Sequence, residues 1–346
     1  MSDNIRYSKP SKDLNIKYSD FVFNNDSALK SVLEINNKYS DMKLREFCKI
    51  CTDPIRTENY IISFGIPYFL CNLCGHLNGR FQDIGEFSKF LYSENSGTNY
   101  SENYEKNFEE RVNSIYRPKA EFLFETLQNQ GGLDLTRTLI LDVGAGAGHF
   151  LKALELIGIS GEGIEVNETL VKQSNQYLLR NSNNVVNANL VLDYVKNSKA
   201  DVISLIGTLE HLEDPISAID AFCHSKAKYL YISVPMISLT AIVQGLDETV
   251  YPRQLSAGHT HLFSNSSLEY LINKFTLLRV GEWWFGTDFL DLMRTLSVKR
   301  TSQDVFANNS KILEIFLAPV LDELQMVLDR NKLCSELHLI LSKETS

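Results

Sequence analysis

The sequence predicts an α/β fold in which a doubly wound, mostly parallel, seven-stranded sheet follows a small cysteine-rich module. Three observations support this prediction. Apolar segments of strand length alternate with helical segments from Leu139 onward, which is typical of a parallel sheet. A glycine-rich turn joins the first of these strands to the first of these helices, and two C-x2-C pairs precede the sheet.

The composition indicates a globular protein. Of its 346 residues 44% are hydrophobic, and the formal net charge of −9 disfavours a broad nucleic-acid-binding surface. The first residues, MSDNIRYSKPSKD, lack the apolar core of a secretory signal, and the longest mostly apolar stretch, LYISVPMISLTAIV, is too short to span a bilayer. We therefore expect a soluble, cytoplasmic protein that has no membrane partner.

Three regions are expected along the chain. Residues 1–90 hold the cysteine module and one helix, over Asp26–Tyr39. Residues 91–132 form a linker or lid and then a helix that starts near Pro118, a residue that suits a first helical turn. Residues 133–346 hold the large sheet.

Within the third region, apolar periodicity and turn residues give the expected elements. The expected strands are Leu139–Val143, Ser160–Glu165, Asn184–Asn187, Asp201–Ile206, Tyr229–Val234, Leu277–Trp284 and Glu336–Leu341. The expected helices are Gly148–Ile157, Glu168–Asn181, Pro215–Cys223 and Ser310–Asn331.

The glycine-rich turn lies in LILDVGAGAGHFLKALELIG. Such a turn lets backbone N–H groups approach a ligand closely at the mouth of a parallel sheet. A dinucleotide fingerprint would need glycine where His149 stands, so the pattern is G-x-G-x-G instead. An acidic residue at the end of the second strand, Glu165, is placed to hold ribose hydroxyls.

With this turn and this acid, residues 118–345 resemble the class I S-adenosylmethionine-dependent methyltransferases. The resemblance implies that Asp142 braces the turn, that the glycines flank the methionine part of the cofactor, and that the seventh strand runs antiparallel. Asn189 and Leu190, which follow the third strand, lack the acidic residue that the family usually has at that point, and Asp193 is the alternative. The implied cofactor residues are Asp142, Gly144, Ala145, Gly146, Gly148, Glu165, Val166, Asn189, Leu190 and Gly207.

The fourth strand ends in a polar tip, SLIGTLEHLEDP, in which Asp214 and Pro215 are typical of a helix start. Glu210 and His211 should face the same crevice as the glycine turn. Methyl transfer needs an aligned acceptor and removal of its proton, and an unperturbed histidine pKa near 6.5 suits a base. His211 is thus the candidate base, with Glu210 orienting it or the acceptor; a structural histidine is the alternative.

The two cysteine pairs, Cys48 with Cys51 and Cys71 with Cys74, have the spacing of a zinc site. Four thiolates leave no open coordination position, so we expect a structural zinc ion. A rubredoxin-like iron site, with similar spacing, is the alternative.

The zinc module, the tyrosine-bearing linker and the LEH tripeptide together resemble the sugar C-methyltransferases that act on nucleotide-linked deoxy-ketosugars. The resemblance implies that Glu210, His211 and one tyrosine lie at the acceptor, the tyrosine being Tyr92, Tyr100 or Tyr104. The chain lacks that family's long C-terminal domain, which leaves C- and O-methylation both open.

Two further histidines, His259 and His261, alternate in the segment HTHLFS and should point the same way on an extended chain. They are candidates for acceptor contacts, with loop histidines in solvent as the alternative. A second metal lacks an evident third ligand.

We therefore expect an enzyme that transfers methyl from S-adenosylmethionine to a small molecule, most plausibly a nucleotide-linked sugar or glycan precursor. The alternatives are an RNA-modifying methyltransferase whose zinc module binds RNA, and a scaffold that binds the cofactor without catalysis. The acidic charge and the absence of an N-P-P-Y or D-P-P-Y motif after the fourth strand count against RNA.

Overall fold

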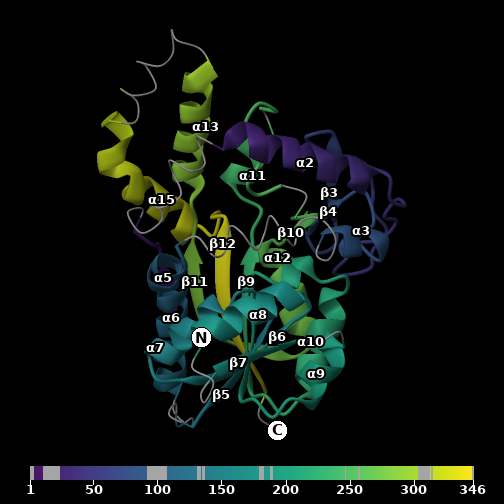
Figure 1. Ribbon diagram of the computed structural model, residues 1–346. Coiled ribbons are helices and arrows are strands. Elements are labelled where there is room, and N and C mark those ends of the chain that lie inside the picture. The colour runs from purple at the N-terminus through teal and green to yellow at the C-terminus, as the bar shows by residue number, and fades with distance from the viewer. Residues whose placement is uncertain are drawn as a thin grey trace.

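A computed structural model describes most of the chain, and Figure 1 shows its layers, with a central sheet beneath a group of helices. The described residues are 4–10, 24–91, 107–130, 134, 137–178, 183–187, 190–245, 247–255, 258–302, 312 and 315–344.

The central sheet has eight strands in the order β1-β11-β12-β9-β8-β5-β6-β7. All seven predicted strands are present, within two residues of the expected bounds. Only β12 runs antiparallel to its neighbours among these strands, as expected for the seventh strand. The strands are β1 (Ile5–Tyr7), β5 (Leu139–Val143), β6 (Ser160–Glu165), β7 (Asn183–Asn187), β8 (Val202–Ile206), β9 (Tyr229–Pro235), β11 (Leu277–Phe285) and β12 (Glu336–Lys343).

The prediction of seven strands is wrong by one, because β1 joins the edge of the sheet parallel to β11. The three residues of β1 are too few and too polar to show a strand pattern. They are held by contacts with distant tryptophans: the Arg6 guanidinium lies 4.4 Å from the centre of the Trp283 ring, and the Trp283 indole N–H donates to the Ser8 carbonyl at 2.9 Å.

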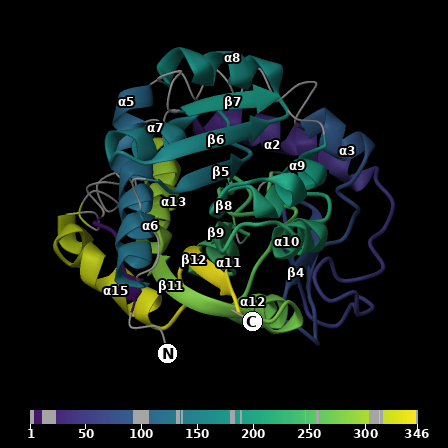
Figure 2. The same cartoon turned by 90° about the horizontal axis from the view of Figure 1, so that it is seen from below.

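Helices cover both faces of the sheet, and Figure 2 shows α6 and α7 on one side with α9, α10 and α12 on the other. Each face buries its own apolar core, one centred on Phe150 and Trp283 and the other on Phe222 and Trp284. The helices around the sheet are α5 (Phe108–Arg111), the π-helix η4 (Val112–Tyr116), α6 (Arg117–Gln130), α7 (His149–Leu156), α8 (Glu168–Tyr177), α9 (Val191–Asn197), η5 (Leu209–His211), α10 (Pro215–His224) and α12 (Asn265–Lys274).

The cysteine module contains a second, four-stranded sheet in the order β10-β4-β3-β2. Its outer strand β10 comes from far along the chain, and pairs His261 with Asn78 and Leu262 with Leu77. The sheet of the module is therefore built from two segments that are distant in sequence. Its elements are α2 (Asn25–Ser40), β2 (Tyr60–Ser63), β3 (Ile66–Leu70), β4 (Leu77–Gly79), α3 (Glu86–Lys89) and β10 (His261–Leu262).

Above the sheet lie α11 (Leu239–Gln244), α13 (Asp288–Ser302), the turn η7 (Ala318–Val320) and α15 (Leu321–Arg330), as Figure 1 shows. The helix predicted over Ser310–Asn331 is confirmed in its last part, α15, but η7 interrupts it in the residues that the structure describes. Pro319 lies in η7, where the chain turns before α15 begins, because proline lacks the N–H that a helix interior requires.

No helix in the described residues has the length and apolar character needed to cross a membrane.

Candidate functional site

The glycine turn follows the carboxyl end of β5, a central strand. The strand order reverses here, between β5 and β8. Gly144 has a φ of 72°, and a Cβ on it would lie 2.7 Å from both the Oγ1 and the Cγ2 of Thr208. Gly148, with a φ of 81°, precedes α7. Glycine is required at Gly144 for two reasons, its backbone angle and its contact with the segment after β8. The glycine turn and the polar tip that follows β8 are thus direct neighbours.

Two predicted acids hold the turn in place. Glu165, at the end of β6, accepts from the Gly146 N–H and the Asn167 N–H, both at 2.9 Å. Asp142 is buried and accepts from the Ser204 hydroxyl at 2.7 Å, while burial raises its pKa to about 7. Glu165 thus contacts the glycine turn directly, whereas Asp142 is bonded to Ser204 of β8.

The remaining predicted cofactor residues lie around this turn. Val166 and Leu190 are exposed, whereas Gly207 ends β8 and donates its N–H to the Ser233 hydroxyl at 2.8 Å. Asn189 lies outside the described residues. The sequence analysis missed Asn187, whose side-chain amide donates to the carbonyls of Glu165 and Val166 and fastens the acidic loop.

Glu210, His211 and His259 form a cluster at the polar tip. One potential ligand atom from each lies within 4.8 Å of the others, and the His211 and His259 rings stack at 5.3 Å between centroids. The two rings come from η5 and from the segment before β10. The structure therefore brings together three of the predicted catalytic residues that are distant in sequence.

Burial changes the protonation of this cluster. It raises the pKa of Glu210 to about 8, and it lowers the pKa of His211 to about 3 and that of His259 to about 4. The expectation of an ordinary pKa near 6.5 for His211 is thus wrong, because the ring is largely enclosed and faces a second histidine. Both imidazoles are neutral at pH 7.

His259 and His261 have different partners. The Nδ1 of His259 lies 2.9 Å from the Gln254 carbonyl, and its ring faces His211. The Nδ1 of His261 lies 2.9 Å from the Nε2 of His76, in the buried sheet of the cysteine module. His261 is therefore away from the cluster, beside the histidine that follows the last cysteine.

A small pocket next to the cluster is lined by both parts of the chain. Glu210, His211, Gly258 and Thr260 form one side. The other side comes from the cysteine module and includes Asp83, which the sequence analysis missed; the three remaining lining residues are Phe87, Ser88 and Leu91. The predicted tyrosines Tyr92, Tyr100 and Tyr104 lie outside the described residues.

Asp83 is held in this wall by cations of the module. It forms ion pairs with Arg45 and with Lys49, whose Nζ lies 2.6 Å from its carboxylate, and it accepts from the Thr260 hydroxyl. Lys49 stands between two of the cysteines in sequence. Nothing in the local sequence distinguishes Asp83 from other acids, because its partners meet it only in the folded chain.

A sequence-family comparison identifies the central part of the chain. The family described as "Methyltransferase domain" matches residues 108–277, which contain the glycine turn, Glu165 and the polar tip. The chain contains a class I, S-adenosylmethionine-dependent methyltransferase domain over these residues. The comparison with curated proteins gives no match.

Solved methyltransferase structures are similar to this methyltransferase in fold. Magnesium protoporphyrin IX methyltransferase from Synechocystis PCC 6803 is 12% identical, covering 74% of this chain and 98% of its own, with a TM-score of 0.47. A plantazolicin methyltransferase is 18% identical, covering 75% and 94%, with a TM-score of 0.45. A methyltransferase from Archaeoglobus fulgidus is 20% identical, covering 68% and 98%, with a TM-score of 0.40. Likenesses this distant identify no acceptor.

The methyltransferase also holds its four predicted zinc ligands together. Cys48, Cys51, Cys71 and Cys74 are buried, and their sulfurs lie within 4.8 Å of one another. The amide of Asn78 donates to the Cys48 sulfur at 3.4 Å, as expected of an outer-shell partner. The donor set and its closed geometry fit a structural zinc ion.

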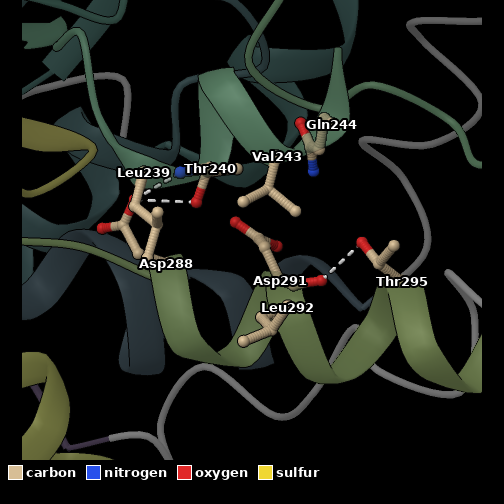
Figure 3. Close-up of a pocket in the computed structure, with 8 residues that line it drawn as sticks. All are labelled: Leu239, Thr240, Val243, Gln244, Asp288, Asp291, Leu292 and Thr295. Carbon is tan, nitrogen blue, oxygen red and sulfur yellow. Dashed lines mark hydrogen bonds between the residues drawn. The ribbon is translucent and has the colours of Figure 1, made fainter. Parts of the chain in front are cut away.

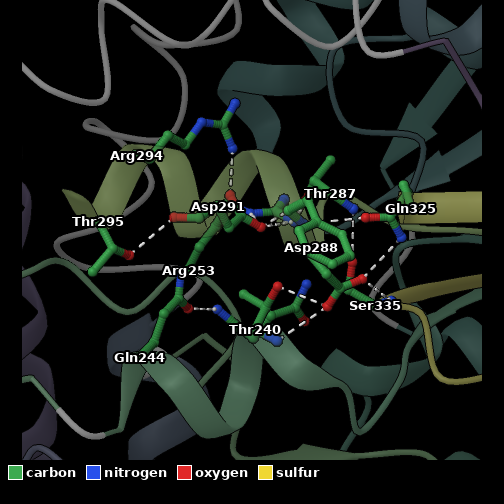
Figure 4. Close-up of polar contacts among 12 residues, drawn as sticks. Thr240, Gln244, Arg253, Thr287, Asp288, Asp291, Arg294, Thr295, Gln325 and Ser335 are labelled. Carbon is green, nitrogen blue, oxygen red and sulfur yellow. Dashed lines mark hydrogen bonds and ion pairs between the residues drawn. The ribbon is translucent and has the colours of Figure 1, made fainter. Parts of the chain in front are cut away.

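Polar contacts above the sheet join α11, α13 and the segment before His259, as Figure 4 shows. Asp288 accepts from the Thr240 hydroxyl at 2.7 Å, and Asp291 pairs with Arg253 at 3.1 Å. A hollow between α11 and α13 has these acids in its wall, but Figure 3 shows Asp288 bonded to Thr240, and Asp291 is paired with Arg253 and Arg294. We therefore read this network as support for the Arg253 segment.

Proposed function

We propose that this methyltransferase methylates a carbon or an oxygen of a small cytoplasmic molecule, namely a nucleotide-linked sugar or related glycan precursor. The observation that carries the proposal is the contact between the cofactor turn and the polar tip. A Cβ on Gly144 would lie 2.7 Å from Thr208, which precedes Glu210 by two residues, and this closeness supports a cofactor on the turn with Glu210 and His211 beside it.

The chemistry needs little from the protein beyond alignment and removal of one proton. The acceptor's electron pair forms a bond to the methyl carbon, and the carbon–sulfur bond breaks with its electron pair passing to sulfur. In O-methylation the acceptor is a hydroxyl. In C-methylation it is an enolate formed by loss of the proton next to a keto group. In the simplest scheme the neutral His211 ring receives that proton, with Glu210 and His259 beside it.

Two features support a small acceptor. The pocket at Glu210 and His211 is small, and residues of the cysteine module, including Asp83, line its other side. The net charge of −9 does not favour a nucleic-acid substrate. The sugar itself is proposed from the resemblance of the zinc module and the LEH tripeptide to sugar C-methyltransferases.

The test is mass spectrometry of nucleotide-sugar pools incubated with the protein and S-adenosylmethionine, in which a product heavier by about 14 Da is expected, the mass of one CH₂. His211→Ala should lower turnover by about 10²–10⁴-fold while binding of S-adenosylhomocysteine stays intact. His224→Ala is the matched control, since His224 is exposed at the end of α10. Unchanged turnover in His211→Ala would remove His211 from the active site.

A further inference from the structure

We infer that Glu210, His211 and His259 bind a divalent transition-metal ion, at a second metal site separate from the four cysteines. The three residues provide two imidazoles and one carboxylate within 4.8 Å of one another. Ligands of a tetrahedral ion with bonds of about 2.1 Å lie about 3.4 Å apart, so the side chains need to close by roughly 1 Å.

The two histidines are oriented as metal ligands usually are. His259 donates its Nδ1–H to the Gln254 carbonyl at 2.9 Å, which leaves the lone pair of Nε2 for a ligand. His211 is hydrogen-bonded to the backbone of Gly258. Metal-binding histidines characteristically use one ring nitrogen for such a bond, because it fixes the ring and its tautomer.

Glu210 provides the carboxyl oxygen for the ion. The residue is 4% exposed, and its Oε2 is buried without a hydrogen-bond partner in the part of the chain that the structure describes. Its Oε1 lies 4.0 Å from the Nε2 of His211, and the Lys119 ammonium is the cation that acts on it from a distance, lowering the pKa that burial raises. A buried carboxylate without a partner is costly, and a bound cation removes that cost.

The segment that provides His259 is held firmly, as a metal site requires. The Gln254 N–H donates to the side-chain carbonyl of Gln244 on α11 at 3.1 Å. Next to it, Arg253 pairs with Asp291 on α13 at 3.1 Å (Figure 4). The carbonyl that orients His259 is thus fixed by two helices.

The donor set indicates which ions fit. Imidazole with one carboxylate suits zinc, iron, cobalt or manganese, whereas magnesium and calcium prefer oxygen ligands alone. Three protein ligands leave at least one position open, in contrast to the closed four-cysteine site.

An ion with an open coordination position can bind the acceptor during methyl transfer. This role rests on the proposed function. A bound cation lowers the pKa of a hydroxyl that it coordinates and stabilises the charge of an enolate. His211 is then a ligand, and the acceptor's proton passes to solvent water. Metal binding itself does not depend on what the acceptor is.

The experiment adds Co²⁺ to the purified full-length protein and counts cobalt and zinc by elemental analysis after dialysis. We expect one cobalt per chain with the zinc count unchanged. Glu210→Gln and His259→Ala should each weaken cobalt binding by at least tenfold, while His224→Ala should not change it. Binding of S-adenosylhomocysteine checks that the variants are folded, and Glu210→Gln keeps the shape of the side chain.

Cobalt that binds only as zinc leaves would overturn the inference, since the cysteines would then be its site. Cobalt binding unchanged by Glu210→Gln and His259→Ala would also overturn it. Methyl transfer without any second metal would leave the proposed function standing and return His211 to the role of base. Cobalt binding with no methylated product would support the metal site and count against the proposed acceptor.

Discussion

The contact between Gly144 and Thr208 allows a quantitative test of the cofactor site. In Gly144→Ala the new Cβ would meet Thr208 atoms at 2.7 Å, in a residue with a φ of 72°. A non-glycine residue in this left-handed region costs about 1–2 kcal/mol, and overlap in a packed site costs about 1–3 kcal/mol. Together these terms amount to about 2–5 kcal/mol.

Because we propose that the cofactor binds at the glycine turn, we expect the cost to appear as weaker binding. A loss of about 2–5 kcal/mol corresponds to a roughly 30- to 4,000-fold increase in the Kd for S-adenosylhomocysteine. Isothermal titration calorimetry measures it. Thr208→Ala removes both overlapping atoms, so the double variant Gly144→Ala/Thr208→Ala should recover the overlap part and keep only the strain.

Gly158→Ala is the matched control. Gly158 has a φ of 78° with nothing within 4 Å of a built Cβ, and it lies beyond α7, at the opposite end of that helix from the turn. It should lower stability by about 1–2 kcal/mol and leave cofactor affinity unchanged. The reasoning is refuted if Gly144→Ala binds the cofactor normally, or if Thr208→Ala recovers none of the lost affinity.

Two more predictions concern the zinc site and the pH dependence of stability. Cys48→Ser should weaken zinc binding by more than about 100-fold, because changes to outer-shell residues alone weaken metal binding by about 10- to 100-fold. Elemental analysis measures the bound zinc. Cys223→Ser is the control, because Cys223 lies outside the cluster. Asp329 is buried, and burial raises its pKa from 3.8 to about 7, so its contribution to stability is full below pH 4 and is lost as the pH rises through 7. Asp329→Asn should abolish that loss, which amounts to at most about 4 kcal/mol, in urea unfolding at pH 4 and pH 8. An equal pH dependence in both proteins would contradict this assignment.

The large sheet was predictable because most of its seven longer strands are apolar runs, and because these runs alternate with helical segments along the chain. The glycine turn and Glu165 were predictable for a similar reason, since they lie within short local patterns. By contrast, β1 has only three residues, Ile5–Tyr7, and is fixed by Trp283, which no local pattern reveals.

The acceptor side of the site was only partly predictable. The sequence marked Glu210, His211, His259 and His261, but it could not show that one loop histidine joins the cluster while the other faces His76. Asp83 was missed because its partners come from two other segments, around residues 45–49 and at Thr260. The pKa of His211 was predicted wrongly, because burial is a property of the folded chain.

The strand pairing between β4 and β10 has a consequence for protein engineering. Since His261 and Leu262 complete the module's sheet, a chimera that takes a cysteine module from a relative needs the matching strand near residue 261 from the same donor. The apolar contacts of Cys48 and Cys74 belong to the same core as Leu268 and Leu271 of α12. If the module and the remaining chain were expressed separately, each would expose the apolar surface that the other covers in the intact protein. This junction is therefore a suitable place to divide the enzyme into a split reporter.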